Sequence, residues 1–355
     1  MSNKIYFTPG PSQLFYTVSD HMKNALKEDV GSISHRSKDF KKIYQFTVER
    51  LKELLNIPDG YEIVFASSAN EIWERIIQNL TAESSHHFVN GAFSDKFFSF
   101  AKQYERHSTA ALVSDGEDFM NWDIPSNAEL VSVTLNETSI GYQTTSKEIE
   151  NLRLKNPDKI IALDAVSAFP STVVDLRLID TTYFSVQKCF GLPSGLGVWI
   201  VNEKCIETAK QLNNTQSTGS YHQLSEMVRM GKNFQTAETP NTLSIYLLGK
   251  IAEDMILRGK QSIVNDTIYK SSILYSALEQ SSLQPFIKTK AHRSKTVIVA
   301  ESEEKTTQLL EDAAANGWIL GAGYGKYKEN QIRIANFPTH SKEQIEQLSD
   351  FISGY

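Results

Sequence analysis

The chain of 355 residues is 40% hydrophobic and 10% aromatic, which is enough for one large compact core and a smaller second one. Its net charge of −6 and its scattered Lys and Arg residues argue against a nucleic-acid partner. Because no apolar run reaches about 18 residues and the opening MSNKIYFTPGPSQL lacks the basic and apolar regions of a signal peptide, we expect a cytoplasmic protein without a membrane partner.

Short β-branched or aromatic runs alternate with helical patterns through the first two thirds of the chain. Apolar residues recur three or four apart in NEIWERIIQNL (70–80) and SDKFFSFAKQY (94–104), which predicts amphipathic helices. Strands are predicted at 62–66, 86–91, 128–135, 159–166, 181–186 and 197–201. This alternation is typical of a mostly parallel sheet covered by helices.

The last two of these strands depart from the alternation. Only about ten residues separate 181–186 from 197–201, too few for a crossover helix, so we expect antiparallel neighbours in a mixed sheet. Residues 240–280 read as helical, and strands follow in KTVIVAE, GWILGAG and QIRIANF, with one helix between them and one after. The predicted fold is therefore α/β, with a large domain over 16–255 and a smaller α+β domain formed by 1–15 and 256–355.

Two residues at strand ends point to chemistry. Lys188, in YFSVQKCFGLPSG, follows one predicted strand, and on its own it would be taken for a solvated surface lysine. Asp164 ends the apolar strand of LDAV, 24 residues earlier. Ligands of open α/β sheets bind at the carboxyl ends of strands. An amine and an acid placed there suit pyridoxal 5'-phosphate (PLP), which needs a lysine to bind it covalently and a carboxylate beside its ring nitrogen.

Three further features fit the same cofactor, and each has a simpler alternative. Ser68, Ala69 and Asn70 form a small-residue turn between a strand and a helix, where a phosphate binds, but Ser68 and Glu71 also make an ordinary capping box. Phe93 has the type of side chain that stacks on a pyridine ring, or is a core residue. Thr138 offers a hydroxyl to the ring oxygen, or belongs to a simple turn.

The sequence resembles class V, fold type I PLP-dependent aminotransferases, and most nearly their phosphoserine aminotransferase branch. Six segments follow that family's order and spacing across nearly the whole chain: FTPGPSQL (7–14), SHRSKDF (34–40), NET (136–138), LDAVSAFP (163–170), SVQKCFGLPSGLGVWIV (185–201) and ETPNT (238–242). Each segment is weak evidence, but the ordered set is specific.

The resemblance implies a role for each matching position. The catalytic residues would be Lys188, which binds PLP, and Asp164, which pairs with its ring nitrogen. The other cofactor contacts would come from Phe93 on the ring face, Thr138 at the ring oxygen, Ala69, Asn70 and Gln187 at the phosphate, and Thr239 at the same phosphate from the second subunit of a homodimer. The substrate-binding residues would be Arg333 at the α-carboxylate, with His35 and Arg36 at a phosphate or side-chain carboxylate.

The implied reaction is amino transfer between O-phosphoserine, or a similar amino acid, and 2-oxoglutarate by a ping-pong mechanism. Some positions depart from the family: Asn70 replaces an arginine, Glu238 replaces a common asparagine, and GAGYGKYKENQIR (321–333) lacks a His-Arg pair. An alternative is therefore another class V transaminase, which would use serine or alanine with glyoxylate or pyruvate. A non-catalytic PLP-binding protein is a further alternative.

The two cysteines argue against a third enzyme class. A cysteine desulfurase needs a nucleophilic cysteine on a mobile loop and a histidine over the ring, whereas Phe93 takes that place and Cys189 and Cys205 lie elsewhere. The same two residues make no disulfide framework and lack metal-ligand spacing with histidine, so we expect a reducing compartment and no metal site.

Overall fold

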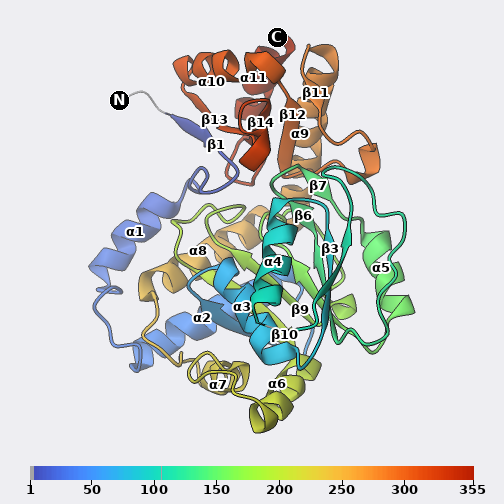
Figure 1. The fold of residues 1–355 in the computed structure, drawn as a ribbon. Helices are drawn as coiled ribbons and strands as arrows, with labels where there is room; N and C mark the ends of the chain where they lie inside the picture. Colours follow the sequence, from blue (N-terminus) through green and yellow to red (C-terminus); the bar gives the residue numbers. More distant parts are fainter. Residues whose placement is uncertain (1–3, 105) are drawn as a thin grey trace.

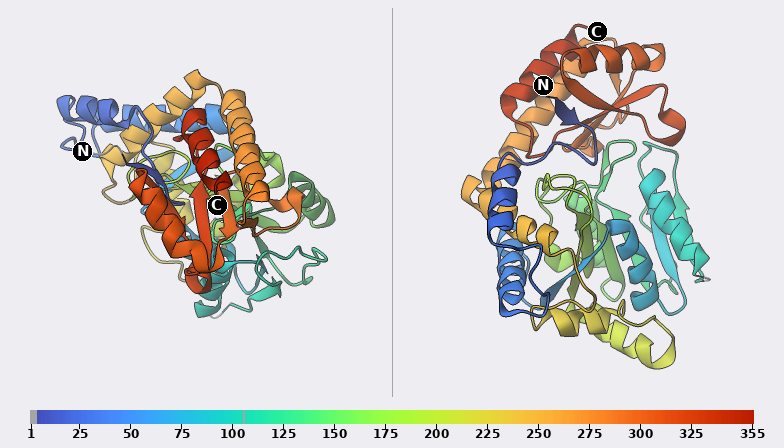
Figure 2. Two further views of the ribbon diagram at one scale, coloured as in Figure 1. Left: turned by 90° about the horizontal axis from the view of Figure 1, so that it is seen from above. Right: turned by 90° about the vertical axis from the view of Figure 1, so that its left-hand side faces the viewer.

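The computed structural model describes residues 4–104 and 106–355, so the first three residues of the predicted small-domain segment 1–15 lie outside the described part. Two lobes are visible in Figure 1: a large one built around a central sheet, and a smaller one that contains the C-terminus. The first strand of the chain lies in the small lobe, whereas the helix that follows it lies in the large one, as the two views of Figure 2 also show.

A seven-stranded sheet forms the centre of the large lobe, in the order β2-β10-β9-β8-β5-β3-β4. Its strands are β2 (Tyr61–Ala66), β3 (Ser85–Val89), β4 (Thr109–Leu112), β5 (Leu130–Thr134), β8 (Ile160–Asp164), β9 (Thr181–Ser185) and β10 (Gly197–Asn202). β10 is antiparallel to β2 and β9, whereas the neighbours from β9 to β4 pair in parallel. The predicted mixed, mostly parallel sheet is therefore confirmed.

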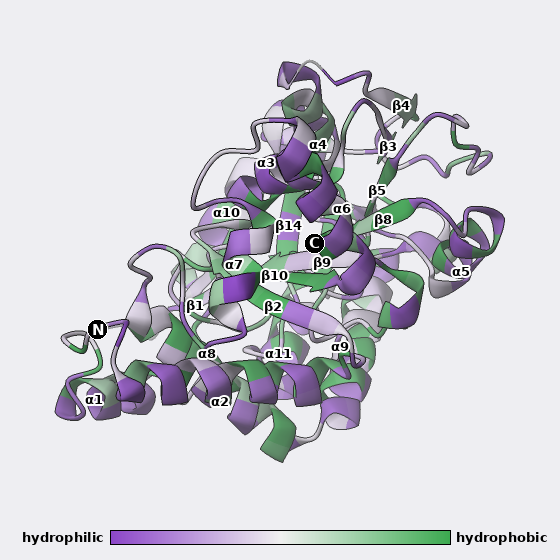
Figure 3. Ribbon diagram, turned by 90° about the horizontal axis from the view of Figure 1, so that it is seen from below, coloured by the Kyte–Doolittle hydropathy of each residue, from purple (hydrophilic) through white to green (hydrophobic). Residues whose placement is uncertain are grey.

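Successive side chains of these strands enter two different cores, because a strand exposes alternate residues to opposite faces. Ile63 and Phe65 of β2 pack into one core and Val64 into the other. The first core is covered by α1 (Val18–Lys27), α2 (Lys38–Leu55), α5 (Ser146–Lys155) and α8 (Thr242–Arg258). The second is covered by α3 (Ala69–Leu80), α4 (Ala92–Gln103), α6 (Glu203–Thr215) and α7 (Leu224–Gly231). Burial on both faces explains the continuous apolar runs of the central strands, which appear in hydrophobic colours between the helices in Figure 3.

A five-stranded sheet in the order β1-β13-β14-β12-β11 forms the small lobe. Its elements are β1 (Ile5–Phe7), α9 (Lys260–Gln280), β11 (Gln284–Pro285), β12 (Val297–Glu301), α10 (Thr306–Ala315), β13 (Trp318–Ala322), β14 (Gln331–Ala335) and α11 (Lys342–Ser353). β1 pairs in parallel with β13, which ties the N-terminal segment to this lobe. The domain limits 1–15, 16–255 and 256–355 stay a prediction. A short hairpin, β6 (Asn136–Glu137) and β7 (Tyr142–Gln143), links β5 to α5.

The described part of the chain contains no helix with the length and apolar character that a bilayer span requires. The cytoplasmic location stays a prediction.

The turn after β9, which carries Lys188, is held between segments from both ends of the chain. Gly191 has φ +60°, and Phe15 N donates to its carbonyl oxygen at 2.8 Å. A Cβ on Gly191 would lie 2.2 Å from Thr339 Cγ2 and 2.7 Å from Phe15 N. Only glycine has both the conformational freedom and the absence of a side chain that this close approach requires.

We expect Gly191→Ala to destabilise the fold by roughly 2–5 kcal/mol, the sum of a left-handed backbone penalty and a steric overlap. Thermal unfolding of the variant measures this as a lower Tm. Gly60→Ala is the matched control, because Gly60 also has a positive φ, of +82°, but has open space around its Cβ position. The control should cost only about 1–2 kcal/mol. Equal losses in the two variants would contradict the role of the Thr339 and Phe15 contacts.

Candidate active site

A cavity of about 180 Å³ opens at the carboxyl ends of β5, β8 and β9 and at the start of α3. It is lined by Gly10, Ala69, Asn70, Trp73, Phe93, Thr134, Asn136, Thr138, Asp164, Val166, Ser185, Gln187 and Lys188. The fold thus brings together seven residues that the sequence placed at the cofactor: Ala69, Asn70, Phe93, Thr138, Asp164, Gln187 and Lys188. Their assigned roles stay predictions.

Lys188 places a buried amine in this cavity. The side chain is 8% exposed, and its Nζ donates to Pro9 O at 2.8 Å and lies 5.8 Å from the centre of the Phe93 ring. Burial, assisted by the positive charge of Arg333, lowers the pKa of Lys188 to about 8, against the opposing effect of Asp164. At pH 8 about half of such amines are neutral, whereas an ordinary lysine with a pKa near 10.4 is neutral in well under about 1% of molecules. A neutral amine is the form that attacks a carbonyl carbon.

Asp164 lies at the end of β8 and is 4% exposed. Burial raises its pKa to about 6, and the hydrogen bond that Val166 N donates at 2.9 Å opposes the rise. The hydroxyl of Tyr183 and the indole N–H of Trp73 lie close to the carboxylate but outside hydrogen-bonding geometry, and they also oppose it. The carboxylate would gain most from a cationic partner, because its present surroundings supply few donors.

The start of α3 faces the same cavity with its positive dipole end. Ser68 is the N-cap residue and accepts from Glu71 N at 3.2 Å, while Ala69 N donates to Ser185 Oγ at 3.1 Å. Glu71 turns away from this point: its Oε2 accepts from Ser67 N at 2.9 Å and its Oε1 lies 3.0 Å from His222 Nε2. Ser68 does not line the cavity, so its hydroxyl serves the helix. The turn can bind an anion without repulsion from an adjacent Glu71 side chain.

Phe93 stands in the first turn of α4, and a buried carboxylate holds that turn in place. Glu137 accepts from Phe93 N at 3.3 Å and from Ser94 N at 2.9 Å. The Phe93 ring also lies 5.0 Å from the ring of Tyr324, a residue of the segment between β13 and β14. A ring that is held by its backbone and by contact with Tyr324 is suited to stacking on a flat ligand.

Arg333, on β14, presents a guanidinium without an ion-pair partner among the described residues. Its Nε donates to Ala322 O at 2.8 Å, and its Cζ lies 5.3 Å from the centre of the Tyr324 ring. Burial lowers the pKa of Arg333, against the influence of Tyr324 and Glu137. A second, longer hydrogen bond runs from Nη1 to Thr138 O at 3.5 Å. The remaining N–H groups of this partly buried guanidinium are free to bind a carboxylate.

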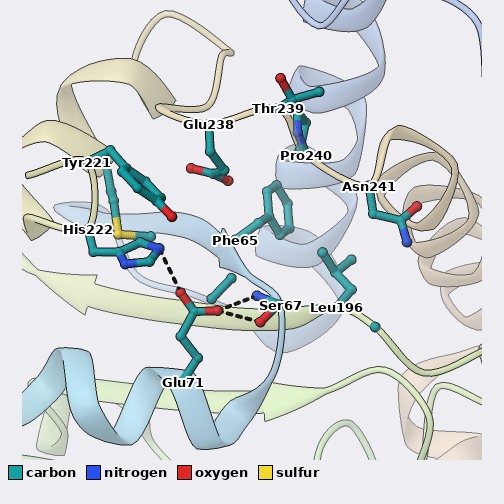
Figure 4. Close-up of a pocket in the computed structure, with 13 residues that line it drawn as sticks. Phe65, Ser67, Glu71, Leu196, Tyr221, His222, Glu238, Thr239, Pro240 and Asn241 are labelled. Atoms are coloured by element: carbon teal, nitrogen blue, oxygen red, sulfur yellow. Dashed lines mark hydrogen bonds and ion pairs between the residues drawn. The ribbon is translucent and has the colours of Figure 1, made fainter.

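Besides Ser68 and Arg333, three further predicted residues do not line this cavity. Arg36 Nη1 donates to Thr236 O at 2.7 Å, and its neighbour His35 is partly exposed. Thr239 lines a second cavity of about 210 Å³, which also contains Glu71 and Glu238 (Figure 4). Burial, together with the charge of Glu71, raises the pKa of Glu238, against the opposing charge of Arg36. Within one chain, His35, Arg36 and Thr239 do not meet Lys188.

Comparison with known proteins decides the family. The family described as aminotransferase class-V matches residues 5–314. The chain belongs to the class V aminotransferases. It is therefore a PLP-dependent transaminase, and the alternative of a non-catalytic PLP-binding protein is wrong.

Individual relatives of this class V aminotransferase match most or all of its length. A phosphoserine aminotransferase of Cytophaga hutchinsonii is 43% identical, with a TM-score of 0.97 over 100% of this chain and 99% of that one. A phosphoserine aminotransferase of Rhodococcus opacus is 28% identical over 337 residues, which are 91% of this chain and 89% of that protein. A PLP-bound phosphoserine aminotransferase of Trichomonas vaginalis is 17% identical, with a TM-score of 0.83 over 98% of this chain and 99% of that one, and shows likeness of fold alone.

The residues of the Lys188 cavity fit PLP. Buried polar atoms without a hydrogen-bond partner belong to three of its lining residues: Trp73 Nε1, Asn136 Oδ1 and Gln187 Oε1. Buried polar groups are normally paired, so a polar ligand is needed to satisfy them. The set also holds an amine of lowered pKa, a buried acid and a helix start, which are the partners that the aldehyde, the ring nitrogen and the phosphate of PLP require.

Sequence reasoning missed several residues of this class V site. Trp73 and Tyr183 follow the apolar periodicity of α3 and β9, so they read as core, and only their polar atoms near Asp164 set them apart. Ser185 and Asn136 line the cavity from segments already quoted for their neighbours. Ser167, in LDAVSAFP, is buried behind Thr138.

Among the described residues, no group of three or more His, Cys, Asp or Glu could hold a metal ion.

Proposed function

We propose that this transaminase transfers an amino group between O-phosphoserine, or a similar amino acid, and 2-oxoglutarate by a ping-pong mechanism. Support for this donor comes from the whole-length similarity to the phosphoserine aminotransferase of C. hutchinsonii at 43% identity. The geometry supports the reaction class: Lys188 and Asp164 line one cavity, and Arg333 adjoins it through a hydrogen bond to Thr138 O.

The residues that would hold PLP follow from the cavity. Lys188 would bind it covalently, Asp164 would meet the ring nitrogen, and Phe93 would lie against the ring face. Thr138 would bond the ring oxygen, while Ala69, Asn70 and Gln187, with the helix capped by Ser68, would receive the phosphate. When bound, PLP supplies an electron-withdrawing ring that stabilises negative charge at the α-carbon of the amino acid.

The chain supplies binding and proton movement. Arg333 would grip the α-carboxylate of donor and acceptor alike, because both substrates carry this group. Lys188, freed from PLP when the amino group of the donor takes its place, would then take the proton from the α-carbon as a general base and return it as a general acid. Its pKa of about 8 lies near the pH at which such an exchange is efficient.

The proposed binding site for the phosphate of the substrate includes residues of a second subunit. Since His35, Arg36 and Thr239 lie away from Lys188 within one chain, we propose that a homodimer brings them to the partner's cavity. There, Thr239 would reach the cofactor phosphate, and His35 with Arg36 would bind the phosphate or side-chain carboxylate of the donor.

A second donor class is favoured by specific positions. Asn70 supplies no positive charge at the start of α3, and the segment 321–333 reads GAGYGKYKENQIR, without a His-Arg pair. Glu238, whose raised pKa reflects burial, lies in the same short segment as Thr239. These differences would suit a class V transaminase that uses serine or alanine with glyoxylate or pyruvate.

A donor and acceptor panel tests the proposal, with the absorbance of bound PLP and the appearance of the 2-oxo acid as readouts. We expect O-phosphoserine with 2-oxoglutarate to have the highest kcat/KM. Arg333→Gln should raise KM about 10- to 100-fold for every substrate, the worth of one hydrogen-bonded ion pair. Arg36→Gln is the matched control, because it should affect O-phosphoserine and not alanine. Faster turnover of serine or alanine with glyoxylate or pyruvate would establish the second donor class instead.

A further inference from the structure

Ser167 joins two side chains that line the Lys188 cavity without lining it itself. It lies three residues after Asp164 and is fully buried. Its Oγ is 2.7 Å from Asn136 Nδ2, 2.8 Å from Thr138 Oγ1 and 3.2 Å from the main-chain oxygen of Asn136. Any influence of Ser167 on a ligand therefore passes through Asn136 and Thr138.

The three contacts of Ser167 fix the direction of each hydrogen bond. A hydroxyl has one proton and two lone pairs, an amide nitrogen only donates, and a carbonyl oxygen only accepts. One arrangement satisfies all three contacts: Ser167 donates to the Asn136 oxygen and accepts from Asn136 Nδ2 and from Thr138 Oγ1. The single proton of Thr138 is then committed to Ser167. Toward the cavity, Thr138 offers lone pairs only.

We propose that Ser167 is a positioning residue of the transaminase site, which makes Thr138 a hydrogen-bond acceptor toward the ring oxygen of PLP. The inference rests on the proposed placement of that oxygen near Thr138. An acceptor stabilises the ring oxygen when it carries a proton, whereas a donor stabilises the ionised form. Ser167 thereby biases the protonation state of the bound cofactor without touching it.

Ser167→Ala should move the titration of the cofactor. In this variant the Thr138 proton is released and can turn toward the ring oxygen, so the ionised form gains a donor. The pH midpoint of the visible absorbance change of bound PLP should fall by roughly one unit, the size expected for one hydrogen bond to a charged group. A merely structural role of Ser167 would change the Tm and leave the midpoint in place.

The direction in which Thr138→Val shifts the pH midpoint gives an independent test. It keeps the proposal falsifiable if Ser167→Ala fails to fold. Loss of an acceptor removes support for the protonated ring oxygen, so the midpoint should fall. Loss of a donor would instead raise it. With Thr138 already replaced by valine, adding Ser167→Ala should produce no further shift, because the effect is transmitted through the missing hydroxyl.

Ser171→Ala is the matched control. Ser171 is a buried serine of the same loop, and its Oγ has no hydrogen-bond partner among the described residues. Its replacement should leave the midpoint unchanged. A rise of the midpoint in Thr138→Val, or an unchanged midpoint in Ser167→Ala, would overturn the inference. If the wild-type chain develops no visible absorbance with PLP, the proposed function fails first, which separates the two outcomes.

Discussion

Lys188→Ala should lose all measurable transamination and the covalent bond to PLP that borohydride makes permanent. The reason is geometric: Lys188 is the one lysine among the residues that line the Lys188 cavity. Treatment of the wild type with borohydride, followed by peptide mass analysis, should place the reduced adduct on Lys188. The rate of bond formation in the PLP-free enzyme should rise with pH through about 8, because only the neutral amine reacts.

Lys270 provides the matched control for this prediction. It is 1% exposed, and burial lowers its pKa to about 7, so pKa alone would make it the stronger candidate. However, its Nζ donates to Phe337 O at 2.8 Å and to His340 O at 2.9 Å, and Lys270 does not line the Lys188 cavity. Lys270→Met should therefore keep the adduct on Lys188. An adduct on Lys270, or on any other lysine, would refute the assignment.

Much of the central sheet was predictable because its strands are buried on both faces. Runs such as KIIALDAV and GVWIV are apolar without interruption, which marks a covered strand, and β8 and β10 were found there. The edge strand β4 reads TAAL, is half-exposed and shows no alternation, so it left no signal. β6 and β7 have two residues each, which is too short for any periodic pattern.

The candidate site was predictable where a reactive residue ends an apolar strand. Asp164 ends β8 and Lys188 lies in the turn after β9, and these adjacent strands bring both residues into one cavity. Tyr183 was not predictable in this way, because its place opposite Asp164 depends on the register between β8 and β9. The distance of His35 and Thr239 from Lys188 is likewise a property of the folded chain, which no spacing along the sequence reveals.

Asp164→Asn should slow turnover by about a thousandfold while leaving the fold intact. A carboxylate about 4 Å from a cationic nitrogen contributes roughly 4 kcal/mol at an effective dielectric constant of 20, which corresponds to about three orders of magnitude in rate if the ring must stay protonated. The neutral amide keeps an oxygen that accepts from Val166 N but loses the charge. Single-turnover kinetics with an amino donor would measure the loss, and near-normal turnover would refute the role of Asp164.

Without PLP, Asp164→Asn should stabilise the fold at neutral pH, although it slows turnover. Because the folded-state pKa of Asp164, about 6, lies above the ordinary value of 3.8, the folded chain holds its proton more tightly than the unfolded chain. That advantage is present in acid and is lost as the pH rises from about 4 to about 6, at a cost to the wild type of about 3 kcal/mol at neutral pH. Asparagine does not titrate, so Asp164→Asn should have a Tm at pH 7 equal to or above that of the wild type, and the difference should shrink toward pH 4.

Asp180→Asn should have the converse effects, a loss of stability with unchanged turnover. Asp180 is a buried aspartate at the other end of the same sheet, where it pairs with Arg153 and accepts from Ile161 N at 2.8 Å. Asp180→Asn leaves that arginine without its charge partner, so we expect a loss of about 3–5 kcal/mol of stability and an unchanged kcat in the molecules that remain folded. A buried acid that stabilises the fold and a buried acid that serves the reaction are thus distinguished by one substitution each. Parallel losses of stability and turnover in both variants would show that Asp164 is structural.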